Sequence, residues 1–511
     1  MKGVKKILAG FLALSMLAGC GESPVQNSST VEEISQTTSQ AETSQTTEEK
    51  PKINILVPYA PFDVKTDNAV KELSEKTGYQ VEFDTLPEQN SNDRLNLIFS
   101  SGNIDYDYIR IGSGDVEKSL FVTYASRGLL EDLTEKIPQY SNLEAIDKQG
   151  YEALSQEGKI YGIPSTGMPY ASATNAIRMD WLEKVGMDVP TTSEELYEVL
   201  KAFKEQDPGG LGENNIPFTA TPATLDGCVS AAFGIIFDYE VRDGKIVDAR
   251  LLPEYKEYLT FMNQLYTEGL LDADMPVNTG TKRLEKCASG RVGFYTGGTD
   301  EARDLLIAKR QEGQDGTYFQ IIPPFKDENG VQRAKSLEGL FGIGMIPAGN
   351  DKVDHILNFM DIYLSEDVFE SIIHGEEGVD YKVEDGERVP ILPDFDKNRG
   401  NMYALFPVQN GETYFPLWKL RTKKTEEAGM YFQQVFDEAG DYLEIRPIAF
   451  APSFDSISDK VKIVQEYALQ EATKFIAGAR SLDEFDAFVE EMNSKGAAEI
   501  VDAYNEWYEN K

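Results

Sequence analysis

The sequence is poor in the side chains that most often bind metals or act as nucleophiles. Its 511 residues include three cysteines and two histidines, His355 and His374. It contains no HExxH pair, no cysteine pair at zinc-site spacing, no GxSxG nucleophile elbow and no GxxxxGKS/T phosphate loop. With 87 acidic residues, some carboxylate pair would lie at a glycosidase distance in any fold. The sequence therefore predicts no catalytic residue, no cofactor and no metal, and indicates a protein that is not an enzyme.

Basic residues are also scarce. The chain has 49 Lys and Arg against 87 Asp and Glu, which gives a net charge of -38. Binding to a phosphate backbone needs Lys and Arg to replace counterions, so nucleic acid is not an expected partner. The same charge repels anionic lipid surfaces, so a basic patch is not expected to hold the protein on a membrane.

Long apolar runs are missing beyond residue 20, and the run at 7–18 is shorter than the roughly 18 residues of a membrane-spanning helix. It follows a short basic head and predicts a signal peptide over 1–19. The tetrapeptide LAGC at 17–20 resembles the lipobox of bacterial lipoproteins. This resemblance implies that Cys20 is acylated and begins the mature chain. A cleaved secretory signal followed by an unrelated cysteine is the alternative.

Large apolar residues are almost missing from 21–50 as well, where Ser, Thr, Gln and Glu dominate. Such a segment cannot bury enough surface to offset the entropy of ordering. We therefore predict a lipid-anchored disordered linker over 20–50. Two cysteines remain, Cys228 and Cys287. They could pair outside the cell, but their spacing does not require it, and two buried free thiols are slightly favoured.

The folded part begins with alternating strand and helix patterns. Apolar runs at 52–57, 80–84 and 106–111 predict strands, and the stretches 68–77 and 92–101 predict helices between them. Strands joined by helical crossovers of this length are parallel neighbours. Ligands of such sheets bind beyond the carboxyl ends of the strands, which here are the loops after the first and third strands.

Several later segments resemble the family 1 extracellular solute-binding proteins of ABC importers, and the likeness covers most of the mature chain. The matching segments are GKIYGIP at 158–164, IRMDWLEKVGMDVPTTSEELYEVLKAFK at 177–204, SGRVGFYTGG at 289–298, EEGVDYKVEDG at 376–386 and KFIAGARSLDEFDAFVEEMNSKGAAEIVDAYNEWYE at 474–509.

This resemblance implies an α/β fold: a two-lobe, periplasmic-binding-protein-like (type II) clamshell with discontinuous lobes and a helical C-terminal tail. Lobe I is expected over 51–165 plus 297–347, and lobe II over 166–296 plus 348–511.

The resemblance also implies the function. The expected protein is a monomeric substrate-binding lipoprotein on the extracytoplasmic face of the cell membrane, held there by the lipid on Cys20. It would capture a solute, most readily a sugar or oligosaccharide, and deliver it to the transmembrane permease subunits of an ABC importer. A lipid-anchored extracellular glycan-active enzyme and a ligand-sensing lipoprotein are the alternatives.

Candidate ligand-binding residues were chosen by position, because sugar sites combine aromatic platforms with hydrogen-bonding side chains. They lie on the loops after the first and third strands, at the expected lobe crossings and in two later turns. The candidates are Tyr59, Asp63, Ser113, Asp115, Thr166, Tyr170, Arg178, Tyr295, Thr299, Asp300, Glu338 and Trp418. Trp181 is instead predicted to lie in the core, because it belongs to an apolar stripe with Ile177, Leu182 and Val185.

Many large relatives are expected to carry a calcium loop of the form D-P-D-G-N-G-x-x-D-E-I-P. It would lie after the helix that is predicted to follow the DWL segment at 180–182. The same place here reads DPGGLGENNIP, at 207–217. Gly209 and Leu211 stand where oxygen ligands belong, and Ca²⁺ needs about 6–8 oxygens. We predict no structural calcium at this loop.

Overall fold

The computed structural model describes residues 50–510, apart from Thr66, Lys424 and the ranges 225–226, 299–300, 302–304 and 306–318. The predicted signal peptide, the lipidation site Cys20 and all but the last residue of the predicted linker lie outside the described residues. The predicted site residues Thr299 and Asp300 do as well.

The first of two main sheets has five strands. Across the sheet they are β2 (Val81–Thr85), β1 (Ile53–Val57), β3 (Tyr108–Gly112), β14 (Leu340–Met345) and β6 (Ile163–Thr166). β1 is parallel to β2 and β3, whereas β14 is antiparallel to β3 and β6. The three predicted parallel strands are therefore confirmed, and two strands from later in the chain complete the sheet.

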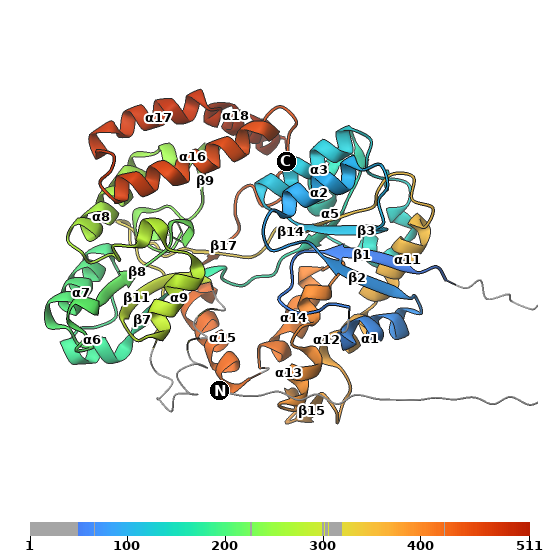
Figure 1. Cartoon of the computed structure of the whole chain (residues 1–511), viewed down its shortest axis with the longest axis horizontal. Helices are drawn as coiled ribbons and strands as arrows, with labels where there is room; N and C mark the ends of the chain where they lie inside the picture. The colour runs from blue at the N-terminus through green and yellow to red at the C-terminus, as the bar shows by residue number, and fades with distance from the viewer. Residues whose placement is uncertain are drawn as a thin grey trace, which may run out of the picture. The chain divides into compact units, whose positions relative to one another are not determined.

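Helices lie on both faces of this sheet (Figure 1). They are α1 (Asn68–Thr77), α2 (Ser91–Ser100), α3 (Asp115–Ser126), α11 (Val353–Leu364) and α12 (Glu366–His374). Successive side chains of a strand point to opposite faces. Ile55 of β1 accordingly packs in one core with Leu73 of α1, and Leu56 packs in another with Phe99 of α2.

Helix α1 shows how local sequence sets the bounds of these elements. The Asp67 carboxylate accepts a hydrogen bond from the amide of Ala69 at 2.9 Å and caps the first turn. Gly78 ends the helix with φ 69°, a left-handed conformation that glycine adopts without a Cβ clash.

The second sheet has four strands. Phe294 and other residues of one face pack in a core of their own, whereas Tyr295 belongs to the same core as Ile55 of the first sheet. Across the sheet the strands are β12 (Phe319–Ile322), β7 (Ala173–Arg178), β11 (Val292–Gly298) and β8 (Ile216–Thr219). β7 is antiparallel to both neighbours, and β11 is parallel to β8. The helices of this region are α6 (Met179–Val185), α7 (Ser193–Gln206), α8 (Pro253–Thr267) and α9 (Gly280–Ala288).

Membership of the two sheets differs from the lobe boundaries expected from the sequence. The range 297–347, expected in lobe I, supplies β14 to the first sheet but β12 to the second. The range 348–511, expected in lobe II, begins with α11 and α12, which pack against α1 beside the first sheet. The reason is that β12 and β14 join strands more than 100 residues earlier in the chain, so no local pattern marks their sheet.

The C-terminal tail is helical, as predicted. It consists of α16 (Ser458–Ile476), α17 (Phe485–Ser494) and α18 (Ala497–Glu509). Helix α16 packs against α8 of the second region and also against α3 of the first. None of the helices in the described part of the chain is both long and apolar enough to span a membrane.

The remaining elements are short or peripheral. They are α4 (Ser141–Glu144), α5 (Lys148–Ala153), β4 (Ser155–Gln156), β5 (Lys159–Ile160), β9 (Tyr239–Arg242), β10 (Lys245–Asp248), β13 (Ala334–Lys335), β15 (Tyr381–Glu384), β16 (Glu387–Pro390), α13 (Asp394–Arg399), α14 (Gly411–Thr422), α15 (Glu426–Ala439) and β17 (Leu443–Glu444).

Cys228 and Cys287 are both buried and free, as the sequence slightly favoured. Burial raises the pKa of the Cys228 thiol to about 11 and raises the pKa of the Cys287 thiol as well. Both therefore stay protonated near neutral pH, which is the unreactive form of a thiol.

Candidate ligand-binding site

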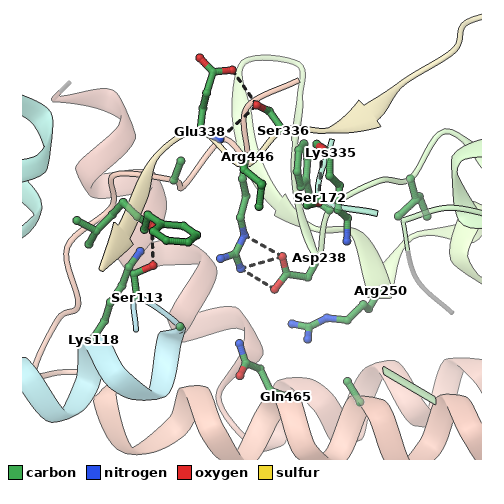
Figure 2. Close-up of a pocket in the computed structure, with 18 of the residues that line it drawn as sticks. Ser113, Lys118, Ser172, Asp238, Arg250, Lys335, Ser336, Glu338, Arg446 and Gln465 are labelled. Atoms are coloured by element: carbon green, nitrogen blue, oxygen red, sulfur yellow. Dashed lines mark hydrogen bonds and ion pairs between the residues drawn. The ribbon is translucent and has the colours of Figure 1, made fainter. Parts of the chain in front are cut away.

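A cavity of about 540 Å³ opens where the surroundings of the two sheets meet (Figure 2). Ser172 and four longer parts of the chain form its walls. The four longer parts are the turn from β3 into α3, the range 235–255 beside the second sheet, the range 335–341 that ends in β14, and the range 446–469 that ends in α16. The cavity thus lies at the carboxyl end of β3, where ligands of parallel strands bind.

The turn from β3 into α3 supplies hydrogen-bonding groups to one wall. The Ser113 hydroxyl donates to the carbonyl of Leu340 at 2.5 Å, which ties this turn to β14. Asp115, in the first turn of α3, accepts hydrogen bonds from Arg446 and Gln465, two residues that line the cavity. A carboxylate in this position also interacts favourably with the helix dipole.

Arg446 is the central charged group of the cavity. Its guanidinium donates to both oxygens of Asp238 at 2.8 Å (Figure 2). It also donates to Asp115 at 3.3 Å. Burial alone would raise the pKa of Asp238, but Arg446, with Arg250 and Lys335, lowers that pKa to about 2. Arg446 therefore joins α3, beside the first sheet, to the region of the second sheet through the carboxylates of Asp115 and Asp238.

Phe341 presents an apolar surface to the cavity. Its side chain is 41 % exposed, whereas the other five residues of β14 are buried. The register between β14 and β6 shifts between Leu340 and Gly342, and such a bulge re-aims a side chain out of the strand pattern. The guanidinium of Arg110 lies 5.9 Å from the centre of the Phe341 ring.

Three of the predicted site residues lie at this cavity. Ser113 and Glu338 line it, and Asp115 bonds to two of its lining residues. Glu338 accepts a hydrogen bond from the Ser336 hydroxyl at 2.8 Å, at the edge of the cavity. Tyr59 and Asp63 lie on the exposed loop after β1 and are not among the lining residues.

Five predicted site residues are buried in packing contacts away from the cavity. Tyr170 and Trp418 pack edge to face with ring centroids 4.7 Å apart. Tyr295 packs edge-on against Phe319 at 5.0 Å. Thr166 accepts a hydrogen bond from the amide of Gly411 at 2.8 Å, and Arg178 donates two bonds of 2.5 Å to Asp180.

Several lining residues had no signal in the sequence. They are Lys118, Asp238, Arg250, Lys335, Phe341, Arg446 and Gln465. Phe341 belongs to an apolar run that predicts a buried strand, and the bulge that exposes it leaves no trace in the composition. Arg446 and Asp238 are about 200 residues apart in the chain, and their pairing depends on tertiary structure.

In the loop at 207–217, the acidic residue Asp207 bonds to the backbone of the loop itself. The Asp207 carboxylate accepts hydrogen bonds from the amides of Leu211 and Gly212, at 2.9 and 2.7 Å. A Cβ on Gly209 would lie 2.7 Å from the indole of Trp181, so a ligand side chain at that position would collide with the core. Among the described residues no cluster of three or more His, Cys, Asp or Glu is placed to hold a metal ion.

Comparison with known protein families gives one match that spans most of the chain. Residues 68–374 match the family described as bacterial extracellular solute-binding protein. Lipoprotein LipO of Bacillus subtilis (strain 168) is 25 % identical and aligns over 99 % of this chain and 98 % of its own length. The polygalacturonan/rhamnogalacturonan-binding protein YtcQ of the same organism is 26 % identical, over 86 % of this chain and 88 % of its own.

Solved structures give the same fold. The crystal structure of the alginate-binding protein AlgQ2 without calcium ion superposes with a TM-score of 0.68. It covers 91 % of this chain and 99 % of the AlgQ2 chain at 20 % sequence identity. This likeness confirms the predicted α/β, two-lobe fold of periplasmic binding proteins.

Proposed function

The chain belongs to the bacterial extracellular solute-binding protein family, and from this premise we propose that it captures a saccharide in the cavity beside Phe341. The observation that carries the proposal is the pairing of one exposed aromatic ring with a surrounding set of polar and charged side chains. Sugars present an apolar ring face and a rim of hydroxyls, and this cavity offers a partner for each.

The cavity suits a ligand of a few sugar rings. Its volume of about 540 Å³ falls within the range of about 300–1,000 Å³ that is typical of small-molecule sites. Phe341 would stack on a ring face. Gln465 and Ser336 would form neutral hydrogen bonds with hydroxyls. Asp238 and Arg446 would form charge-assisted hydrogen bonds with them, which are stronger.

The named relatives support a carbohydrate ligand. YtcQ binds polygalacturonan and rhamnogalacturonan, according to its name, and AlgQ2 binds alginate. Both ligands are carbohydrate polymers, and the sequence resemblance independently favoured a sugar or oligosaccharide.

The mechanism we propose is capture without catalysis. Residues from the region of each sheet line the cavity. A ligand that contacts both regions would therefore stabilise the closed form, in which the two regions lie close together. That form would then dock on the transmembrane subunits of an ABC permease, and an ATPase in another chain would supply the energy. The protein would act as a monomer on the extracytoplasmic face of the membrane, anchored by lipid on Cys20.

Thermal unfolding against a panel of mono- and oligosaccharides tests this proposal. A ligand at 100 times its Kd adds about 2.7 kcal/mol to the free energy of unfolding, a shift of several degrees. We expect a saccharide to produce such a shift and to be recovered chemically unchanged. Peptides and CaCl₂ serve as controls and should leave the transition in place. A saccharide that is consumed would indicate an enzyme instead, and a panel without any shift would contradict the proposal.

A further inference from the structure

We propose that the saccharide bound in this cavity is anionic and carries carboxylates, as an oligomer of uronic acids does. The inference rests on the proposed function, because it names the chemical class of the saccharide for the same site. The observation behind it is that Lys118, Arg250 and Lys335 line one cavity. Each has N–H groups that donate no hydrogen bond to the described residues.

Basic residues outnumber acidic residues in the cavity lining, whereas acidic residues outnumber basic ones in the whole chain. Four basic residues and two acidic residues line the cavity. The complete sequence has 49 basic and 87 acidic residues, so basic side chains are concentrated here against the general composition. A protein with a net charge of -38 repels anions at long range, and a local cluster of cations is what a bound anion would require.

Two arginines form ion pairs with three aspartates at this site. Arg446 pairs with Asp238 and Asp115, as described above. Arg250 forms a two-point pair with Asp248, with both N–O distances 2.7 Å. Because Arg446 is shared, one of these three negative charges is not balanced by an arginine, and Asp238 also interacts electrostatically with Lys335 and Lys118. The two lysines therefore bring two positive charges against one unbalanced carboxylate of the three.

The lysines and one arginine nitrogen form no short ion pair of this kind with a described residue. Lys335 Nζ makes no hydrogen bond or ion pair within 4.0 Å of any described residue, although its charge contributes to the low pKa of Asp238. Lys118 is 7 % exposed, and its ammonium group donates to the carbonyl of Ala451 at 3.3 Å, without an ion pair in the described part of the chain. The Nη1 atom of Arg250, a residue only 6 % exposed, likewise has no partner among the described residues.

The remaining acidic residue of the lining does not offset these cations. Glu338 bonds to Ser336, and Figure 2 shows its carboxylate pointing away from Lys118 and Arg250. In the same view Lys118 lies on one side of the cavity, Lys335 and Arg250 lie on the other, and Arg446 lies between them. Cations thus face the cavity from both sides.

A carboxylate-bearing saccharide satisfies this arrangement better than a neutral one. Its carboxylates would accept from the lysine ammonium groups and from Arg250, in bonds stronger than those to hydroxyls. They would also reduce the repulsion between cations on opposite sides. A neutral sugar would dehydrate the same cations without supplying a countercharge, which is costly in a low-dielectric site. Phe341 would stack on the ring face in either case.

Calorimetric titration with a matched pair of ligands tests the inference. The acidic ligand is tri-galacturonate and the neutral one is galactotriose, which has the same ring without the carboxylate. Tricarballylate, a tricarboxylate without sugar rings, is the third probe. We expect tri-galacturonate to bind at least about tenfold more tightly than galactotriose, since hydrogen bonds to charged groups exceed neutral ones by this order. Its affinity should fall between about 50 and about 500 mM salt.

The variant Lys335→Gln tests the role of the cations directly. Lys335 is only partly buried, so its replacement is compatible with folding, which thermal unfolding of the unliganded variant checks. We expect Lys335→Gln to lower the affinity for tri-galacturonate about tenfold and to leave galactotriose unaffected. Lys326→Gln is the matched control, because Lys326 is also partly buried but does not line the cavity.

The outcomes separate this inference from the proposed function. If galactotriose binds as tightly as tri-galacturonate, or if Lys335→Gln changes the affinity no more than Lys326→Gln, the anionic class is wrong and saccharide capture stands. If tricarballylate binds as tightly as tri-galacturonate, the cavity recognises carboxylates without sugar rings, and both proposals fail. If no saccharide of either charge binds, saccharide capture itself is contradicted.

Discussion

Replacing Trp181 with alanine is expected to lower the free energy of unfolding by about 3–5 kcal/mol, the usual cost of a large cavity in a core. The indole is fully buried in the core of the second sheet. It meets the ring of Phe203 edge to face, with centroids 5.3 Å apart, and the guanidinium of Arg178 lies 4.8 Å from its centre. Gly209 and Gly293 leave the space that the indole fills, since a Cβ on either would lie within 2.8 Å of it.

Urea unfolding followed by circular dichroism measures this effect. The variant Trp181→Phe keeps an aromatic ring and most of the volume, so its loss should be smaller than that of Trp181→Ala. A Trp181→Ala protein within about 1 kcal/mol of the wild type would contradict this packing of the core.

The variant Arg446→Met is expected to cost about 3 kcal/mol near neutral pH, because it leaves Asp115 and Asp238 without their shared cation. Breaking a buried ion pair usually costs about 3–5 kcal/mol, and we expect the lower value because the Arg446 side chain is 27 % exposed. Arg127→Met is the matched control. Arg127 is exposed and forms no ion pair in the described part of the chain, so its replacement should change the stability by less than about 0.5 kcal/mol.

The cost of Arg446→Met should depend on pH in a defined direction. Asp238 has a folded pKa of about 2, below its ordinary value of about 3.9. Its contribution to wild-type stability is therefore complete above about pH 4 and is lost as the pH falls toward about 2. Without Arg446 the buried carboxyl group takes up a proton at higher pH. The difference between variant and wild type should shrink below about pH 4, and a difference that grows there would contradict the pairing.

The sequence predicted local elements well, because their signals are local. The strands β1, β2 and β3 and the helices between them follow from apolar periodicity and from caps such as Asp67 and Gly78. The assignment of Trp181 to the core is confirmed for the same reason: a helical apolar stripe reports burial directly. The family resemblance then supplied the two-lobe fold that periodicity could not.

Site residues were harder to identify, because an aromatic side chain near an expected crossing can lie in a core or in a cavity. Tyr170 and Trp418 were chosen as sugar platforms, but the structure packs them against each other in the interior. Phe341 lies in a run that predicts a buried strand, and a bulge turns it to the cavity. The pairing of Arg446 with Asp115 and Asp238 spans hundreds of residues, so only the three-dimensional arrangement reveals it.

Calorimetric titration of a saccharide into wild type, Phe341→Ala and Tyr403→Ala tests the central claim most directly. The ligand is the saccharide with the largest shift in the thermal panel. Tyr403 is the matched control, since its ring is about equally exposed but lies outside the cavity. We expect Phe341→Ala to weaken binding about tenfold through the lost ring stacking, and Tyr403→Ala to bind as the wild type does. An unchanged affinity in Phe341→Ala would contradict saccharide capture in this cavity.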